Sequence, residues 1–311
     1  PGHVRADLPE WVVGRFERLF GPDWVAEGES LALRPPLDMR VNRVKADREK
    51  LLAALGKFGA VATRYSPAGV RIQATAGDRR HPNVQVEPAF QKGWFEVQDE
   101  GSQIAAFAVA PQPGERVLDL CAGAGGKSLA LASIMENKGQ VTATDTDRAR
   151  LAPIFERVKR AGVHSVQVRE AKAPLHDLVG KMDAVLIDAP CTGTGTWRRR
   201  PDAKWRLTER AVGNRLREQA EILESAIPYV KAGGRLVYVT CSVLPDENED
   251  QVAAFLERHP EFSATPPAAV IGRSGSAAAL ATDALHRANG FVLSPHRTAT
   301  DGFFVASLVR R

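Results

Sequence analysis

The stretch RVLDLCAGAGGKS (residues 116–128) joins an apolar run to a glycine-rich turn that ends in Gly-Lys-Ser. That ending suggests a Walker A phosphate loop, but the motif needs a glycine five positions earlier, where this chain has Cys121. A nucleoside-binding loop instead needs glycines after the first strand of a parallel sheet and an acid closing the second, about 20 residues on. Asp145 lies 19 residues after Gly126 and closes QVTATD. The sequence therefore favours a nucleoside cofactor, and these residues leave NAD and S-adenosylmethionine both open.

Strands and helices alternate around this loop, which predicts an α/β fold with a doubly wound parallel sheet over residues 93–311. Apolar runs predict its strands at 116–121, 140–145, 165–170, 183–188 and 235–240. Helical patterns lie between and after them, at 126–136, 147–161, 208–230 and 246–258. Alternation in GFFVASLVR predicts a terminal antiparallel strand at 302–310, and the Ala-, Ser-, Gly- and Pro-rich segment 265–285 reads as a mobile surface excursion without a site.

A smaller α/β domain is predicted over residues 1–92. Asp7 and Glu10 have the spacing of a capping box, so we expect a helix over 7–20. A strand over 38–46, a helix over 47–59 and short strands at 61–65 and 69–73 complete this domain.

Composition restricts the class of protein. The 311 residues are 44% apolar and 25% charged, as in ordinary globular proteins, and no apolar run reaches the roughly 18 residues that cross a bilayer. The first residues lack the pattern of a secretion signal, and three cysteines do not make a disulfide framework. We expect a monomeric cytoplasmic protein that does not bind membranes. The net charge of +5 is compatible with nucleic-acid binding without establishing it.

Two cysteines follow neighbouring predicted strands. Cys191 lies in IDAPCTGTG after the fourth strand, and Cys241 lies in YVTCS after the fifth. Ligands of open parallel sheets bind at the carboxyl ends of the strands, so both thiols should face one crevice. Cys121, within the cofactor loop, is read instead as a small buried apolar group.

A thiolate beside a nucleoside cofactor suits methyl transfer to carbon 5 of cytosine, which is a poor nucleophile unaided. Addition of a thiolate to carbon 6 makes carbon 5 nucleophilic, and loss of the carbon-5 proton later expels the thiolate. Asp188, three residues before Cys191, is placed either for ring nitrogen 3 or for the cofactor. The spacing alone does not rank the two thiols.

Five segments carry a family resemblance: GWFEVQDEGSQIA, DLCAGAGGKS, DAPCTGTGTWRRRPDAKW, YVTCSVLPDENEDQV and SPHRTATDGFFVASL. They resemble the RsmB/Nop/Sun family of RNA (cytosine-5)-methyltransferases, from about residue 40 to the C-terminus. Within that family the chain is most similar to the bacterial 16S rRNA enzymes, whose separate N-terminal RNA-binding helical domain we expect it to lack. The resemblance implies a Rossmann-like class I methyltransferase sheet with a small RRM-like N-terminal domain.

The resemblance also implies S-adenosylmethionine as the cofactor, Cys241 as the nucleophile and Cys191 as the residue that assists product release. Asp145 would take the ribose hydroxyls, and Asp188 would lie between cofactor and base. The methionine end and ribose would be held by Cys121, Ala122, Gly123, Ala124, Gly125, Gly126 and Lys127. Two positions depart from the family. Ala124 stands where proline is usual, and Glu170 is the nearest acid to the usual aspartate after the third strand, so it is assigned to the cofactor site.

The segment TWRRRPDAKWR (196–206) predicts an RNA-binding surface directly after Cys191, because basic side chains hold phosphates and aromatic rings stack on unpaired bases. Its expected contacts are Arg198, Arg199, Arg200, Lys204 and Trp205. Arg40, Arg43 and Lys45 would form the other wall of the crevice. His296 is expected to be structural, since no zinc pattern or other metal site is present.

The target base must leave its stack to reach a thiol, so we expect a single-stranded or looped RNA, with 16S rRNA as the first candidate. Three alternatives stay open. The chain could methylate tRNA, it could be a catalytically silent RNA-binding or ribosome assembly factor, or it could be an NAD-dependent oxidoreductase. The last gives no reason for two thiols at strand ends.

Overall fold

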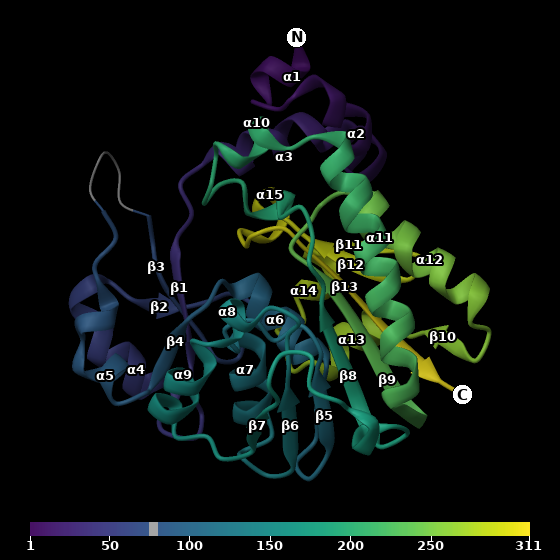
Figure 1. Cartoon of the computed structure of the whole chain (residues 1–311). Coiled ribbons are helices and arrows are strands. Elements are labelled where there is room, and N and C mark those ends of the chain that lie inside the picture. Colours follow the sequence, from purple (N-terminus) through teal and green to yellow (C-terminus); the bar gives the residue numbers. More distant parts are fainter. Residues whose placement is uncertain (75–79) are drawn as a thin grey trace.

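A large mixed sheet forms the centre of the computed structural model, which describes residues 1–74 and 80–311 (Figure 1). Its strand order is β11-β12-β13-β9-β8-β5-β6-β7. The strands β7, β6, β5, β8 and β9 pair in parallel, which confirms the predicted α/β sheet. Their bounds are β5 (Arg116–Asp119), β6 (Gln140–Ala143), β7 (Val166–Val168), β8 (Met182–Asp188) and β9 (Val230–Thr240).

Antiparallel strands extend the sheet beyond β9. The strand β13 (Phe303–Arg310) pairs antiparallel with β9, as predicted for the C-terminal segment. The additional strands β10 (Phe262–Ala264), β11 (Leu285–Arg287) and β12 (Gly290–Leu293) are too short to stand out in the sequence pattern.

Helices cover both faces of the large sheet (Figure 1). Along β8, Val185 and Ile187 join one apolar cluster, while Ala184 and Leu186 join the other, so the strand is buried on both faces. The helices are α6 (Glu100–Ala108), α7 (Gly126–Ile134), α8 (Arg148–Leu151), α9 (Ile154–Ala161), α10 (Ala203–Arg206), α11 (Glu209–Ala226), α12 (Glu249–Arg258), α13 (Pro267–Arg273), α14 (Leu280–Asp283) and α15 (Pro295–Thr298). None of the helices in the described residues is both long and apolar enough to span a bilayer.

The segment 265–285 is not the surface excursion that its composition predicted. It contains α13 and α14, and Val270, Ile271 and Leu280 are buried in the second apolar cluster. The backbone N–H of Ala277 also donates to the carbonyl of Tyr65. These few apolar side chains anchor the segment to the core, whereas most of its alanines and glycines are exposed.

A second, antiparallel sheet with the order β2-β3-β1-β4 forms the small domain. Its strands are β1 (Leu37–Val41), β2 (Val61–Ala62), β3 (Gly69–Ile72) and β4 (Phe95–Val97), and its helices are α4 (Arg48–Leu55) and α5 (Pro88–Gln91). The strand β4 lies after the domain boundary predicted at residue 92 and still pairs with β1. The two sheets are therefore connected through β4, and the division at 92/93 stays a prediction.

The helix predicted over residues 7–20 is confirmed only for residues 10–20, and its predicted start at Asp7 is wrong. The chain forms α1 (Gly2–Arg5), a 3-10 turn at Glu10–Val12, α2 (Val13–Phe20) and α3 (Trp24–Ala32), which lie beside α10 and above α15 at the top of Figure 1. Asp7 has a left-handed backbone, with φ of 53°, and caps no helix. Its carboxylate instead accepts a hydrogen bond from the ammonium of Lys204, so a tertiary ion pair replaces the local cap.

A clasp joins the small domain to α9. The buried Asn42 amide donates to the carbonyls of Gly93 at 2.9 Å and Ala161 at 2.7 Å. Gly93 has φ of 72°, and a Cβ there would lie 1.9 Å from the carbonyl oxygen of Arg160, so only glycine permits this approach. The two domains thus meet through close backbone contact.

We expect Asn42→Ala to lower the free energy of unfolding by about 2 kcal/mol, because two carbonyls at the joint lose their donor. Urea denaturation followed by circular dichroism measures the change. The matched control is Asn214→Ala on the exposed face of α11, which should change stability by less than about 0.5 kcal/mol. Equal losses in the free energy of unfolding would show that the hydrogen bonds of Asn42 do not stabilise the joint between the domains.

Candidate functional site

The two thiols predicted at neighbouring strand ends lie beside one another, with 3.4 Å between the Sγ atoms of Cys191 and Cys241. Cys191 follows β8 and Cys241 follows β9, and these strands pair in parallel with Asp188 opposite Val239. Both cysteines are free and half-buried. The pairing of β8 with β9 thus carries two sulfur atoms to one point at the edge of the sheet.

The protonation of Cys191 is set by its surroundings. The hydrogen bond with Cys241 has the largest effect on the pKa of the Cys191 thiol, and burial and the charge of Glu247 act in the same direction. Together they raise this pKa well above its ordinary value. Cys191 therefore stays protonated and can donate its S–H to Cys241. Burial likewise raises the pKa of Cys121, which agrees with an inert, apolar role for that side chain.

A network of short polar side chains ties the two cysteine loops together. The hydroxyl of Thr194 lies 3.0 Å from that of Ser242 and accepts a hydrogen bond from the N–H of Val243. The N–H of Gly195 donates to the carbonyl of Cys241 at 3.0 Å, and Asn248 donates to the carbonyl of Ser242. Sequence reasoning missed these positioning residues. The signal was present, since Thr194 comes three residues after Cys191 and Ser242 comes directly after Cys241.

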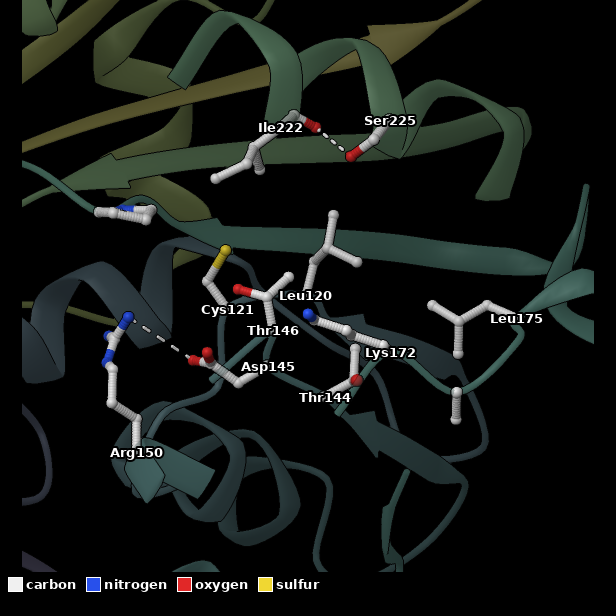
Figure 2. Close-up of a pocket in the computed structure, with 12 residues that line it drawn as sticks. Leu120, Cys121, Thr144, Asp145, Thr146, Arg150, Lys172, Leu175, Ile222 and Ser225 are labelled. Atoms are coloured by element: carbon white, nitrogen blue, oxygen red, sulfur yellow. Dashed lines mark hydrogen bonds and ion pairs between the residues drawn. The ribbon is translucent and has the colours of Figure 1, made fainter. Parts of the chain in front are cut away.

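A pocket of about 140 Å³ lies between the ends of β5 and β6 and the helix α11. Figure 2 shows Asp145, Cys121 and Arg150 on one side of it and Ile222 of α11 on the other. The carboxylate of Asp145 is 3% exposed and accepts the N–H of Gly123 at 2.9 Å. The acid predicted to close the second strand thus forms a wall of the pocket and holds the glycine turn.

The glycine turn fits a nucleoside cofactor. Gly123 has φ of 48°, and a Cβ there would enter the space beside Asp145 and Arg150. Gly125 has φ of 79°, and its Cβ would lie 2.4 Å from Ile154, so space excludes a side chain there, whereas at Gly123 only the positive φ disfavours one. Lys172 lines the same pocket with a left-handed backbone. The turn thereby leaves room for a ligand against its backbone.

Asp119 supplies an unused acceptor behind this turn. It is fully buried at the end of β5, where one carboxylate oxygen accepts the Ser128 hydroxyl at 2.6 Å and the other has no hydrogen-bond partner. Burial, ahead of the neighbouring carboxylates, raises the pKa of Asp119 to about 7. Such an oxygen fits a cofactor or a bridging water that brings hydrogen-bond donors.

A wider crevice of about 450 Å³ adjoins the pocket, because Cys121 and Arg150 line both. Lys127 and Asp188 face it, with 2.7 Å between Nζ and Oδ2, and the Lys127 ammonium lies 5.4 Å from the centre of the Phe303 ring. Lys127 is nearly buried, whereas about a third of the Asp188 side chain is exposed. The crevice therefore presents a positive and a negative group side by side.

Glu170 does not belong to this site. It is exposed beyond the end of β7 and lines a separate hollow with Arg148, Leu151 and Phe155. After β7 the chain leads away from the pocket. Lys172 and Leu175, rather than Glu170, line the pocket on this side. The assignment of Glu170 to the cofactor is corrected accordingly.

Two of the arginines predicted to contact RNA are held by carboxylates. Arg198 and Arg199 both pair with Asp99, which precedes α6, and with Asp301, which precedes β13. The Arg198 side chain is only 5% exposed, against 33% for Arg199. Arg198 therefore joins three segments at the mouth of the crevice, and Arg199 keeps one edge exposed.

The rest of the segment 196–206 divides between core and surface. Lys204 is 1% exposed and pairs with Asp7, so it is a structural residue and is unavailable to RNA. Trp197 is buried and stacks on Phe16 of α2, with 6.1 Å between ring centres. Arg200 is exposed, and Trp205 is 59% exposed. One face of the segment thus packs on the N-terminal helices while the other faces outward.

Arg40, Arg43 and Lys45 were predicted to form the other wall of the RNA crevice, but Arg40 and Lys45 make contacts within the protein instead. Arg40 is buried, and burial lowers its pKa to about 10. Its guanidinium donates to Gln98 at 2.6 Å and to the carbonyl of Gly126 at 3.4 Å. Arg40 therefore reaches from the small domain to the glycine turn and is no part of an exposed RNA surface. Lys45 donates to the backbone carbonyl of Arg160 at the clasp.

Comparison with known proteins gives consistent matches over most of the chain. The family described as 16S rRNA methyltransferase RsmB/F matches residues 106–309, and the ferredoxin-like domain of RsmF/B-like methyltransferases matches residues 8–77. Ribosomal RNA small subunit methyltransferase B of Citrobacter koseri is 36% identical over 307 residues, which cover 97% of this chain and 66% of that protein. This chain thus spans slightly less than two thirds of the length of that relative.

Solved structures agree with this likeness. The crystal structure of PH0851 superimposes with a TM-score of 0.84 at 34% identity, covering 98% of this chain and 67% of that one. NSun6 from Pyrococcus horikoshii, solved with SFG, has a TM-score of 0.80 at 23% identity over 97% of this chain and 98% of that one. At that identity the second likeness shows the fold alone.

The contact between Cys191 and Cys241 predicts that mild oxidation by diamide joins them in an intramolecular disulfide. Their sulfurs need to approach by roughly 1.4 Å to reach the S–S bond length of about 2.05 Å. Mass spectrometry of peptides should show the 191–241 crosslink before any modification of Cys121, which is buried. Crosslinks to Cys121 at comparable rates would contradict the arrangement.

Proposed function

Because the chain belongs to the RsmB/F family of 16S rRNA methyltransferases, we propose that it transfers a methyl group from S-adenosylmethionine to carbon 5 of a cytidine in RNA. The observation that carries the proposal is the pair of free thiols 3.4 Å apart at the edge of the sheet, beside a pocket shaped for a nucleoside. Since the relatives are longer than this chain, their substrate is carried over as part of the proposal.

We assign the cofactor to the glycine turn. Asp145, which lines the pocket, would accept the ribose hydroxyls. Asp119 lines neither the pocket nor the crevice and would support the turn from behind through Ser128. Gly123 and Gly125 let the backbone approach the cofactor, and Arg40 and Arg157 hold the turn from behind through the carbonyls of Gly126 and Ala124. When bound there, S-adenosylmethionine would supply an electrophilic methyl group.

Cys241 is the proposed nucleophile. Its thiolate adds to carbon 6 of the cytosine, which forms an S–C6 bond and makes carbon 5 nucleophilic toward the methyl group. Negative charge builds on the ring during this addition, and the adjacent Lys127 and Asp188 face the crevice where the ring would lie. We propose that the Lys127 ammonium stabilises this charge, and that Asp188 acts at ring nitrogen 3 only as an acid that donates a proton there.

Cys191 assists release. The carbon-5 proton leaves to solvent, its electron pair restores the C5–C6 double bond, and the S–C6 bond breaks with its electrons returning to Cys241. Cys191, which its surroundings keep protonated, donates its S–H to the departing sulfur. An anionic leaving group is stabilised by a hydrogen bond made at that moment.

The exposed Arg200, Trp205 and the open edge of Arg199 are the proposed RNA contacts of the segment 196–206. Looped or single-stranded 16S rRNA is the first candidate substrate, in keeping with the named relatives, and tRNA is the second. A thiol nucleophile requires a reducing compartment, so we propose that the protein acts in the cytoplasm. A monomeric state stays a prediction.

Methyl transfer from tritiated cofactor to 16S rRNA and to tRNA tests the proposal. Cys241→Ala should lower kcat by at least about 1,000-fold, because no thiolate adds to the ring. Cys191→Ala should accumulate a protein–RNA adduct, visible as a slow band in a denaturing gel. The double variant is the control and should show no adduct. Absence of methyl transfer by the wild-type protein to either RNA would favour a silent assembly factor.

Asp145→Asn should weaken S-adenosylmethionine binding by about tenfold or more in calorimetry, because hydrogen bonds to the ribose lose their charged acceptor. Asp147→Asn is the matched control. It lies in the same loop outside the pocket, and asparagine keeps its capping contacts with α8. Equal affinity of both variants would remove Asp145 from the ribose site.

A further inference from the structure

Glu247 is a buried carboxylate that connects the two cysteine loops. It closes the 3-10 turn Pro245–Glu247, six residues after Cys241, and is 0% exposed. One of its oxygens accepts the backbone N–H of Thr192 at 2.8 Å and the amide of Gln219 at 3.0 Å. The other accepts the Thr192 hydroxyl at 2.5 Å. A side chain from the Cys241 loop thus holds the residue that follows Cys191.

Both peptide groups around Cys191 are held by this cluster. The amide of Gln219, on α11, also donates to the carbonyl of Pro190 at 2.9 Å. Glu247 itself is anchored to β9, because the Tyr238 hydroxyl donates to its carbonyl at 2.7 Å. Cys191 is therefore fixed on its N-terminal side through Gln219 and on its C-terminal side through Glu247.

These hydrogen bonds alone do not explain why a charged glutamate, and not a neutral glutamine, stands at position 247. No salt bridge in the described part of the chain involves Glu247, and burying an unpaired carboxylate is costly. A neutral glutamine would accept the same two N–H groups through its oxygen, and the Thr192 hydroxyl could turn to accept from its amide. A purely structural clamp would therefore be more stable without the charge.

We propose that Glu247 is a positioning residue that fixes Cys191 beside Cys241 and keeps Cys191 in the thiol form. The inference deepens the proposed function and rests on it, since it explains how two equivalent side chains acquire different roles. The titratable groups that act on Cys191 are Cys241 at the end of β9, Glu247 on the 3-10 turn and Tyr238 within β9.

The position of the Glu247 carboxylate determines which of the two thiols its charge affects. Through Thr192, the carboxylate is held beside the Cys191 backbone. A fixed negative charge disfavours a second negative charge nearby, so a proton shared between the thiols resides on Cys191. Cys241 then receives the S–H hydrogen bond, and the same S–H meets the sulfur again when the S–C6 bond breaks.

The first test needs neither RNA nor cofactor. Alkylation of Cys191 by iodoacetamide is measured by peptide mass spectrometry as a function of pH, because only the thiolate reacts. Glu247→Gln keeps the clamp and removes the charge, so the midpoint for Cys191 should fall by about one pH unit or more. Asp246→Asn, in the same turn but paired with Arg15 at 3.2 Å, should leave it in place. An unshifted midpoint in Glu247→Gln would overturn the role of the charge.

The second test separates position from charge. Thr192→Val removes one hydrogen bond to Glu247 but keeps its charge, so the Cys191 alkylation midpoint should stay high. Its kcat for methyl transfer should fall about tenfold or more while its affinity for S-adenosylmethionine is unchanged, since misplaced reacting groups slow the chemistry. A wild-type kcat in Thr192→Val would refute the positioning role. If the wild-type protein transfers no methyl group, the proposed function fails, and the alkylation profiles still decide the role of Glu247.

Discussion

The parallel pairing of β8 with β9 is the constraint on which the site depends. It sets Asp188 opposite Val239 and brings the next turns of the two strands together, so that Cys191 and Cys241 meet at 3.4 Å. A shift of one residue in this register would send the inward side chains of β9 to the other face and separate the sulfurs. The antiparallel β13 pairs with the edge of β9 that faces away from β8, and these hydrogen bonds help to hold β9 in its register.

Around this pair, much of the positive charge near the site serves structure. Arg198 and Arg199 join the segment after Cys191 to Asp99 and Asp301, and Arg40 reaches the glycine turn from the small domain. Arg157 and Arg160 meet on Glu96 of β4. These contacts make the small domain part of the support of the cofactor turn. Groups near a reacting centre must be held within a fraction of an ångström, which explains this density of ion pairs.

Chemical roles at the site follow from the surroundings of each group. Three cysteines with the same side chain occupy different positions: Cys121 is buried against the pocket, whereas Cys191 and Cys241 share a hydrogen bond. Burial raises the pKa of Cys121, whereas the hydrogen bond with Cys241 is the largest cause of the raised pKa of Cys191. Lys127 and Asp188 illustrate the same rule, since pairing permits a nearly buried ammonium beside a partly exposed carboxylate.

The sequence by itself determined the parallel sheet, the glycine turn with Asp145 and the two cysteines after neighbouring strands, because apolar runs and glycine positions are local signals. Only the tertiary structure decided that Lys204 pairs with Asp7, that Trp197 stacks on Phe16 and that Glu170 lies outside the pocket. It also anchored the Ala- and Gly-rich segment 265–285 to the core through Val270, Ile271 and Leu280. The identity of a basic or acidic residue does not reveal its partner, and Lys204 is buried by a contact with a residue 197 positions away, which no local pattern contains.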